Sequence, residues 1–344
     1  MIRRYQTRVD VIRNGAVLTT LHPASSPVVD CKISGELKVS LSGSFYENPD
    51  VNWLTDELQP QQIIDGTEYP VGIFAVASVL DAYGKDGVKT ITVEAYDRCL
   101  RLKQTKTETI LHIPAGTNYI SAVESLLVDA GVALWLSTPT VKVTATDRED
   151  WPIGTSYLEI INTLLAEINY GSIWFNTSGF AVLQPTKTPS ASNIDHHYGE
   201  LEDIRVLSRD CSREIDMFDA PNVFIAICEN PDLGSPLIAT AVNENPLSSL
   251  SVFRRGRRIA QTFKVDNIPD QEALDKYAQQ LMLRSMLSEE TVSITTANMP
   301  GHTVGNTIAL THPDVCGLFQ EVSWHLVLAP GQLMQHTLRR SMIV

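Results

Sequence analysis

The sequence predicts a β-rich α+β protein in which two small β-barrel-like domains flank an α+β module, with a helix inserted in the second barrel. Short segments with alternating apolar and polar residues, typical of half-buried strands, occupy both ends of the 344-residue chain. Two helical stripes, each followed by short strands, lie in the middle. We therefore expect a first barrel over residues 1–113, an α+β module over 114–203, and a second barrel over 204–344 with a helix at 270–287.

The first domain shows the pattern of several short strands. Val9 and Val11 alternate with polar residues up to Asn14-Gly15, a dipeptide that favours a two-residue hairpin turn. The later segments GIFAVASVL and KTITVEAYD alternate again and are separated by the turn sequence YGKDG. Short strands without a strong helical stripe predict a small barrel or sandwich.

The middle module contains two helical stripes, each ended by a glycine, Gly131 and Gly171. The apolar residues of the two stripes are Tyr119, Val123, Leu126, Leu127 and Ala130, then Leu158, Ile161, Leu164, Leu165 and Ile168. After the first helix we expect a short strand at Val141–Val143. After the second we expect a hairpin that turns between Asn176 and Gly179.

The C-terminal domain returns to the period-two alternation of strands, beginning near Val223, and one helical segment interrupts it. Asp270 is expected to cap this helix, and Lys276 is expected on its exposed face. Its apolar face is predicted to contain Leu274, Tyr277, Ala278, Leu281, Met282 and Ser285. Further strands are expected near residues 291, 305, 322 and 336.

One feature suggests that the two β domains are related by duplication. Val71-Gly72 and Val304-Gly305 each stand ahead of an alternating strand, in comparable places of the two domains. A glycine before a strand is common in β proteins, so the pair alone does not establish a repeat.

Charge and composition exclude several classes of protein. The net charge of −13 disfavours general binding to nucleic acid or to an anionic membrane, because the chain as a whole repels phosphate groups. Five scattered cysteines without a CxxC pair favour reduced thiols over disulfides or a zinc site. No segment has the apolar run of a signal peptide or a membrane span, so we expect a soluble protein made in the cytosol.

Catalytic and cofactor-binding motifs are missing from the sequence: it contains no GxSxG, HExxH, GxxxxGK[ST] or GxGxxG. Carboxylate groups such as Glu289-Glu290 or Asp147-Glu149-Asp150 fit solvated charges, although a glycosidase pair is a possible alternative. We therefore predict no catalytic residue and no cofactor.

Metal-ligand residue types gather only at Asp195-His196-His197, in a polar connection without a third ligand at regular spacing. A structural role is favoured there over a metal site. The same holds for four histidines that stand alone in different strands and connections. These are His302, His312, His325 and His336. We predict no metal site.

Arg254, Arg255, Arg257 and Arg258 surround Gly256 in an otherwise acidic chain. The structural interpretation is a hairpin tip or strand edge that like charge keeps away from other edges, and it is the favoured one. The functional interpretation is a docking patch for an acidic partner or for nucleic acid.

The order of units resembles the baseplate hub and tail-tip proteins of tailed phages and of related contractile injection machines. Three parts of the chain carry the resemblance. The first is IDGTEYPVGIFAVASVL followed by KTITVEAYDRCLRLKQ, and the second is a helix–strand module that ends in LLAEINYGSIWFNTSGFAVLQP. The third contains DAPNVFIAI, NPLSSLSVF and DQEALDKYAQQLMLRSMLSEETVSI. The resemblance covers nearly the whole chain and lies in pattern and order.

The resemblance implies a structural virion protein without enzymatic activity. Hubs of this kind form homotrimers whose six barrels make a ring, which joins a sixfold tail tube to a threefold tip and leaves a channel for DNA. The implied partners are a tube or distal tail protein above, a spike, fibre or tip protein below, and the tape measure protein. The last residues, Met342 to Val344, are expected in a barrel strand, so an enzymatic tip would be a separate polypeptide.

Two alternatives remain. One is a receptor- or glycan-binding module of the tail, which exposed tryptophans in one groove would favour: Trp53, Trp135 or Trp151. The other is a cell-wall hydrolase, which needs two acidic residues, or a histidine with a nucleophile, in one cleft.

Overall fold

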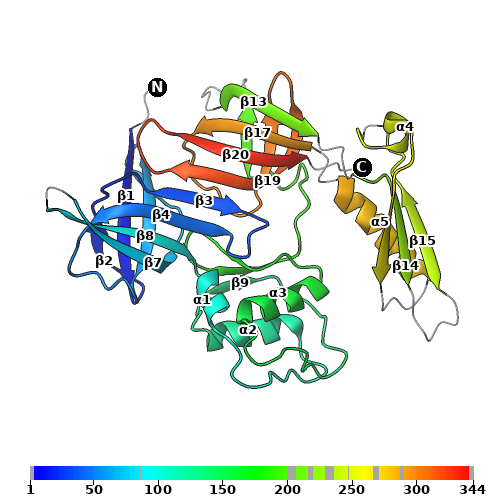
Figure 1. Cartoon of the computed structure of the whole chain (residues 1–344), viewed down its shortest axis with the longest axis horizontal. Helices are drawn as coiled ribbons and strands as arrows, with labels where there is room; N and C mark the ends of the chain where they lie inside the picture. The colour runs from blue at the N-terminus through cyan, green and yellow to red at the C-terminus, as the bar shows by residue number, and fades with distance from the viewer. Residues whose placement is uncertain are drawn as a thin grey trace. The chain divides into compact units, whose positions relative to one another are not determined.

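The computed structural model divides the chain into two compact units, and Figure 1 shows their elements. Unit 1 comprises Met1–Lys187, Thr296–Asn306 and Val322–His336. Unit 2 comprises Thr188–Thr295, Thr307–Glu321 and Thr337–Val344. The structure describes residues 4–84, 87–199, 207–215, 220–228, 236–246, 248–265, 271–286 and 290–340. Asp270 and Met342 to Val344 lie outside the described residues.

Unit 1 is built on a large antiparallel sheet. Its strands are β1 (Tyr5–Arg13), β2 (Ala16–Leu21), β3 (Val28–Lys32), β4 (Val39–Tyr46), β5 (Glu57–Ile64), β6 (Thr67–Pro70), β7 (Phe74–Tyr83), β8 (Lys89–Asp97) and the Ser323–Val327 part of β19 (Cys316–Val327). The strand order is β19-β3-β4-β8-β7-β5-β1-β2, with β6 on β5. Pairing among these described strands forms an open path, so a closed barrel stays a prediction.

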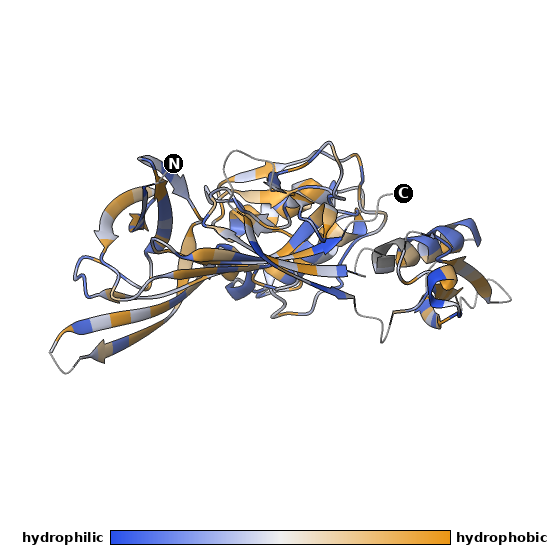
Figure 2. Ribbon diagram, turned by 90° about the horizontal axis from the view of Figure 1, so that it is seen from above, coloured by the Kyte–Doolittle hydropathy of each residue, from blue (hydrophilic) through white to orange (hydrophobic). Residues whose placement is uncertain are grey.

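The alternation that predicted these strands matches their burial. On β8, Ile91, Val93 and Ala95 are buried, and Thr92 and Glu94 between them are exposed. Apolar and polar residues alternate along the strands in Figure 2. The hairpin expected at Asn14-Gly15 is confirmed, because both residues have positive φ, 52° and 78°, between β1 and β2.

A helical layer completes unit 1. It contains α1 (Cys99–Gln104), α2 (Tyr119–Asp129) and α3 (Tyr157–Glu167), with a small sheet of β9 (Trp135–Ser137), β10 (Trp174–Phe175) and β11 (Ala181–Leu183). Eight of the ten residues in the two predicted stripes are buried in its core, and the turn between Asn176 and Gly179 is confirmed. Helix α1 was not expected.

The strand predicted at Val141–Val143 is wrong. The strand after α2 is β9, which pairs in parallel with β11. Trp135 packs against the core and donates its indole N–H to Glu124, 2.9 Å away, whereas Val141 is 96% exposed. The larger apolar side chain therefore decides which segment joins the sheet.

Unit 2 contains an α+β layer with its own core. Its elements are β14 (Val223–Cys228), β15 (Leu237–Val242), β16 (Ala260–Val265) and α5 (Gln271–Met286). Strand β14 pairs antiparallel with β15 and parallel with β16. Helix α5 packs on β14 and β15 and buries Leu274 and Ala278, while Lys276 is exposed, so the face predicted for this helix is confirmed.

The other elements of unit 2 are strands, three of which continue into unit 1. They are β12 (His196–Gly199), β13 (Leu207–Ile215), β17 (Glu290–Ala297), β18 (Thr307–Thr311), the first part of β19, and the end of β20 (Leu333–Arg340). Strand β12 runs parallel to β18, which pairs antiparallel with Cys316–Gln320 of β19. The strands expected near 291, 305, 322 and 336 are confirmed. Val71-Gly72 and Val304-Gly305 precede β7 and β18, as expected, while duplication itself stays a prediction.

Across the part of the chain that the structure describes, no helix combines the length and the apolar character that crossing a membrane would require.

Candidate functional site

The arginine cluster lies on a short helix, α4 (Val252–Arg255), and on the turn that follows it. This segment connects β15 to β16, which flank β14 on opposite sides, so it is a crossover and the predicted hairpin tip or strand edge is wrong. The Ser251 hydroxyl accepts a hydrogen bond from the backbone N–H of Arg254, 3.3 Å away, and caps the helix. Gly256 ends it with φ 63°, in the left-handed region.

Buried polar side chains hold this crossover in place. Asn222, which is fully buried, donates to the carbonyl oxygens of Leu250 and Arg257 at 3.2 and 2.9 Å. Its own oxygen accepts from the backbone N–H of Ile259 at 2.7 Å. Such hydrogen bonds fix the loop because a buried amide left without partners is costly. The arginines therefore project from a rigid support.

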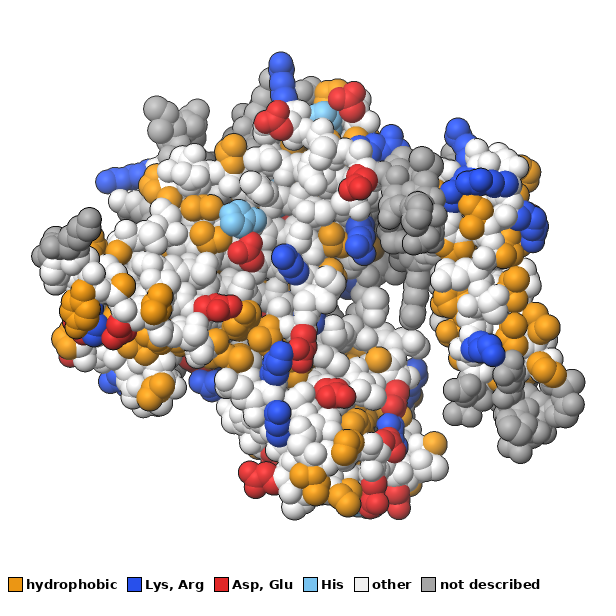
Figure 3. Space-filling view, viewed as in Figure 1, with side chains coloured by type: hydrophobic (Ala, Val, Ile, Leu, Met, Phe, Trp, Pro, Cys, Tyr) orange, Lys and Arg blue, Asp and Glu red, His pale blue; other side chains and the backbone are white. Residues whose placement is uncertain are grey.

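Arg254, Arg257 and Arg258 are exposed and Arg255 is partly buried, and a phenylalanine directly precedes them in α4. Arg254 donates to the Pro246 carbonyl at 3.0 Å and Arg255 to the Ala220 carbonyl at 2.6 Å. Among the described residues, no carboxylate pairs with Arg254, Arg257 or Arg258, and blue side chains gather over α4 in Figure 3. Phe253 is 69% exposed. We call Phe253, Arg254, Arg255, Arg257 and Arg258 the Phe-Arg patch.

Sequence reasoning singled out the four arginines and missed Phe253. An exposed aromatic residue beside arginines is typical of the residues that contribute most to protein–protein interfaces. The signal was visible as an apolar residue directly before the basic run. Phe253 was not selected as a site residue because an apolar residue next to a strand is normally buried.

A second surface feature is a hollow on the exposed side of α3 in unit 1. Its volume is about 710 Å³, and Glu36, Leu158, Glu159, Asn162, Thr163, Ala166 and Glu167 line it. We call this hollow the α3 groove. Asn162 accepts a hydrogen bond from the backbone N–H of Ile173 at 2.9 Å, so the wall is fixed to the strand that follows. The groove combines apolar surface with three carboxylates.

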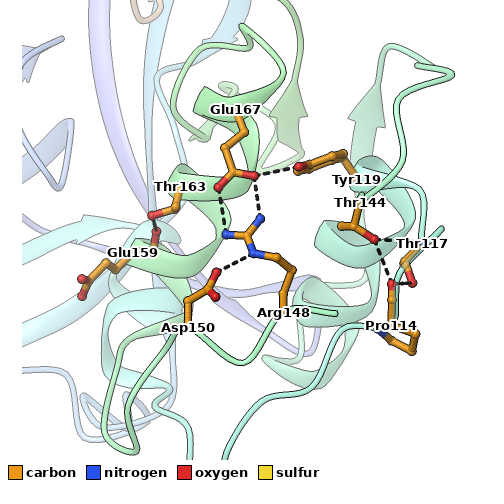
Figure 4. Close-up of polar contacts among 9 residues, drawn as sticks. All are labelled: Pro114, Thr117, Tyr119, Thr144, Arg148, Asp150, Glu159, Thr163 and Glu167. Atoms are coloured by element: carbon orange, nitrogen blue, oxygen red, sulfur yellow. Dashed lines mark hydrogen bonds and ion pairs between the residues drawn. The ribbon is translucent and has the colours of Figure 1, made fainter. Parts of the chain in front are cut away.

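The three carboxylates differ in their surroundings, as Figure 4 shows for two of them. Glu167 accepts two hydrogen bonds from Arg148, at 2.7 and 2.9 Å, and one from the Tyr119 hydroxyl at 2.8 Å. Burial, together with Glu167, raises the pKa of Tyr119 above its usual value. Glu36 pairs with Lys103 at 2.5 Å.

Glu159 is the carboxylate of the α3 groove that remains available to bind a partner. It stands in the first turn of α3, where its backbone N–H donates to the capping Ser156 hydroxyl at 3.2 Å. Its carboxylate points away from Arg148 in Figure 4, and no described cation or donor contacts it. Glu159 is exposed, and the helix dipole favours negative charge in this first turn.

Each of the four histidines of the sequence analysis contacts another residue of the fold. His325 bonds Asp30 at 2.7 Å, and His312 bonds the Arg209 carbonyl at 3.3 Å. His302 and His336 are buried in unit 1 with ring centroids 4.9 Å apart, and His336 bonds the Thr296 hydroxyl at 2.8 Å.

His196 and His197 begin strand β12 and do not lie in a loop as the sequence suggested, whereas Asp195 lies in the connection directly before the strand. The Asp195 carboxylate accepts from the backbone N–H of Thr307 at 2.8 Å, and its own N–H donates to the Thr307 carbonyl at 2.9 Å. The ring of His196 is stacked on that of Tyr198. Asp195 therefore anchors β12 to β18.

The carboxylates considered for catalysis are engaged in local contacts. Asp147 accepts from the backbone N–H of Ala115, and Glu149 and Asp150 pair with His112 and Arg148. In unit 2, Glu290 pairs with Arg213 and Arg340, while Glu289 lies outside the described residues. The five cysteines are free thiols, as expected.

The tryptophans do not form an exposed platform. Trp151 is 6% exposed, and Trp53 and Trp135 pack, partly buried, against two different cores of unit 1. Because the three rings do not share one groove, they do not favour the glycan-binding alternative.

No known protein-family profile matches the sequence. No curated protein matches it either. Solved structures do match. A tail protein from Neisseria meningitidis shares 14% identity with a TM-score of 0.69, and the match covers 97% of each chain. The 43 kDa tail protein of prophage MuSo2 from Shewanella oneidensis shares 11% identity with a TM-score of 0.70, over 98% of this chain and 99% of that one.

A third similar structure is an Escherichia coli component of the type VI secretion system, described as structurally similar to the bacteriophage T4 tail proteins gp27 and gp5. It shares 7% identity with a TM-score of 0.53, over 98% of this chain and 76% of that one. The chain thus has, over nearly its whole length, the fold of phage tail proteins, as the order of its units suggested.

Proposed function

We propose that this chain is a structural hub protein of a phage tail tip or baseplate. One observation carries the proposal: the fold of tail proteins extends over almost the entire chain, including both the sheets and the helical layers. A match of this extent leaves no large part of the chain for an unrelated function. Fold alone does not dictate function, so the surfaces of the molecule must support the same conclusion.

We further propose a homotrimer that joins the sixfold tail tube to a threefold tip or spike and leaves a channel for DNA. Each chain would contribute two barrel-like β domains to a ring of six. The net charge of −13 supports a channel through which DNA passes without specific binding, because like charge prevents retention. The protein would then reside in the virion tail after synthesis in the host cytoplasm.

The role is structural and not enzymatic. In the described residues, the candidate carboxylates and histidines serve ion pairs, strand contacts and hydrogen bonds within the fold. The α3 groove does bring acidic residues into one hollow, as a hydrolase needs, but Glu36 pairs with Lys103 and Glu167 with Arg148. Only Glu159 is left without a described cation, so the hydrolase alternative lacks the pair it requires, and the three tryptophans do not favour the glycan-binding alternative.

The proposed neighbours are the tail tube or distal tail protein above, a spike, fibre or tip protein below, and the tape measure protein. The Phe-Arg patch is the candidate docking surface. Arg254, Arg257 and Arg258, which pair with no carboxylate among the described residues, would attract an acidic surface, and the exposed Phe253 would supply an apolar contact.

The test of the hub is its mass and symmetry. Light scattering of the purified protein should give three copies per particle, and negative-stain images should show a threefold ring with a central hole. A particle that stays a monomer in solution and also occupies a position outside the central ring in tails would contradict the proposal.

A variant with serine at all four arginine positions tests docking. The isolated variant should fold with an unchanged circular dichroism spectrum, and the yield of complete tails should fall, because the attraction that speeds encounter is removed. A variant with serine at Lys276, an exposed cation on α5, is the matched control. Normal tail yield from the arginine variant would remove the patch from the assembly pathway.

A further inference from the structure

One chain carries two exposed surfaces of opposite charge and matching chemistry. The Phe-Arg patch in unit 2 combines an exposed aromatic ring with exposed guanidinium groups. The α3 groove in unit 1 combines the exposed Ala166 with the carboxylates of Glu36, Glu159 and Glu167, of which only Glu159 has no described cation partner. Red side chains gather over this helical layer in Figure 3.

The groove is suited to an aromatic residue with a neighbouring arginine. A volume of about 710 Å³ exceeds the space that a phenylalanine ring needs, so a guanidinium can enter as well. Glu159 can accept a bidentate pair from arginine because its carboxylate has no described partner. Arg148 and Tyr119 hold Glu167 in one orientation, which lowers the entropy lost when a partner binds.

The Phe-Arg patch is suited to inserting into a groove on a partner molecule. The crossover that carries it is fixed by Asn222, and Gly256 turns the chain so that arginines stand on both sides of the bend. Arg254, Arg257 and Arg258 have no ion pair with any described residue, so docking would not break an existing one. Arginine and aromatic residues together are typical of the central contacts of interfaces.

We propose that the Phe-Arg patch of one copy of this chain docks into the α3 groove of a second copy. The inference rests on the proposed homotrimer and names the contact that would hold it together. Charge complementarity selects the second copy, because the same chain supplies both the basic projection and the acidic hollow. A contact between two different surfaces is head-to-tail, and three such contacts close a ring.

Charge reversal tests this contact. The patch variant carries Arg254→Glu, Arg257→Glu and Arg258→Glu, and the groove variant carries Glu159→Arg and Thr163→Arg. Arg255 is left unchanged because its hydrogen bond to the Ala220 carbonyl is partly buried, whereas the bond from Arg254 to the Pro246 carbonyl is exposed. Each variant alone should dissociate the trimer, weakening association by roughly ten-fold or more, since like charges then face each other. The chain with all five substitutions should form trimers again, because the two charges are exchanged.

Two reversals outside the proposed contact are the controls. Glu149→Arg lies on the same helical layer but does not line the groove, and Lys276→Glu lies on the exposed face of α5. Both should remain trimers by sedimentation velocity at about 0.15 M salt, where charges separated by more than ~8 Å are screened. Circular dichroism verifies that every variant is folded.

The outcomes separate this contact from the hub itself. If the patch variant and the groove variant each still form trimers, the proposed contact is wrong, while the hub proposal is unaffected. If both single-surface variants dissociate and the combined variant does not form trimers again, the proposed contact would also be overturned, because the patch and the groove would then bind different partners. A wild-type protein that is monomeric at every concentration would overturn the ring together with the contact.

Discussion

Asp97 at the end of β8 is a buried acid whose ionisation affects folding. Its side chain is 3% exposed, and one carboxylate oxygen accepts the backbone N–H of Cys99 at 3.0 Å. The other oxygen has no hydrogen-bond partner. Burial raises the pKa of Asp97 from 3.8 to about 6, against the opposing effects of the Cys99 hydrogen bonds and of Lys38, which is also buried.

The pH dependence of stability follows from that pKa. Because the pKa of Asp97 is higher in the folded than in the unfolded state, protonation of Asp97 stabilises the folded state. This stabilisation is complete below about pH 4 and is lost as the pH rises to about 6. Relative to Asp97→Asn, the free energy of unfolding of the wild type should fall by on the order of 1 kcal/mol per pH unit in this window. Urea unfolding of both proteins at pH 4.5, 5.5 and 7 measures this difference. A difference in the free energy of unfolding that does not change with pH would contradict the prediction.

At the scale of single elements, helix α5 shows how burial decides the cost of a substitution. Leu274 is fully buried against β14 and β15, so Leu274→Ala should lower the free energy of unfolding by ~2–5 kcal/mol through lost transfer energy and a cavity. Lys276 makes an exposed pair with Glu272, so Lys276→Ala should change it by no more than ~0.5 kcal/mol. Equal shifts of the unfolding midpoint for the two variants would show that the assigned face is wrong.

Local periodicity explains which elements the sequence could predict. The stripes of α2, α3 and α5 and the alternation of β8 depend on residues within a few positions, and the structure confirms them. Strand β9 could not be chosen in the same way. Its selection over Val141–Val143 depends on pairing with β11, more than 40 residues later in the chain.

The candidate site was partly predictable for the same reason. The arginines are consecutive enough to be noticed in the sequence, but the helix that carries them depends on buried Asn222, which is remote in sequence. The α3 groove could not be predicted, because it combines Glu36 with residues of α3 that follow more than 120 positions later. Only the folded chain brings them together.

At the scale of the whole molecule, the net charge determines how strongly the protein can bind DNA. Four arginines could neutralise at most about four phosphates, and the remaining surface of a chain with net charge −13 repels the rest of the duplex. In the proposed hub, this charge balance would prevent DNA that passes through the channel from being retained.

We therefore expect no binding to duplex DNA at physiological salt. Fluorescence anisotropy of a labelled 20-base-pair duplex should show no complex at about 0.15 M salt with protein up to about 100 μM, a concentration that detects ordinary nonspecific binding. At about 0.02 M salt, weak binding should appear, and it should disappear again when Arg254, Arg255, Arg257 and Arg258 are replaced by serine. The reason is that the patch concentrates positive charge, and three of its arginines pair with no carboxylate in the described part of the chain. Replacing Lys276 instead should leave the low-salt signal unchanged. Tight binding at physiological salt would mean that the arginines hold phosphate groups and that the patch recognises nucleic acid, in place of a protein surface.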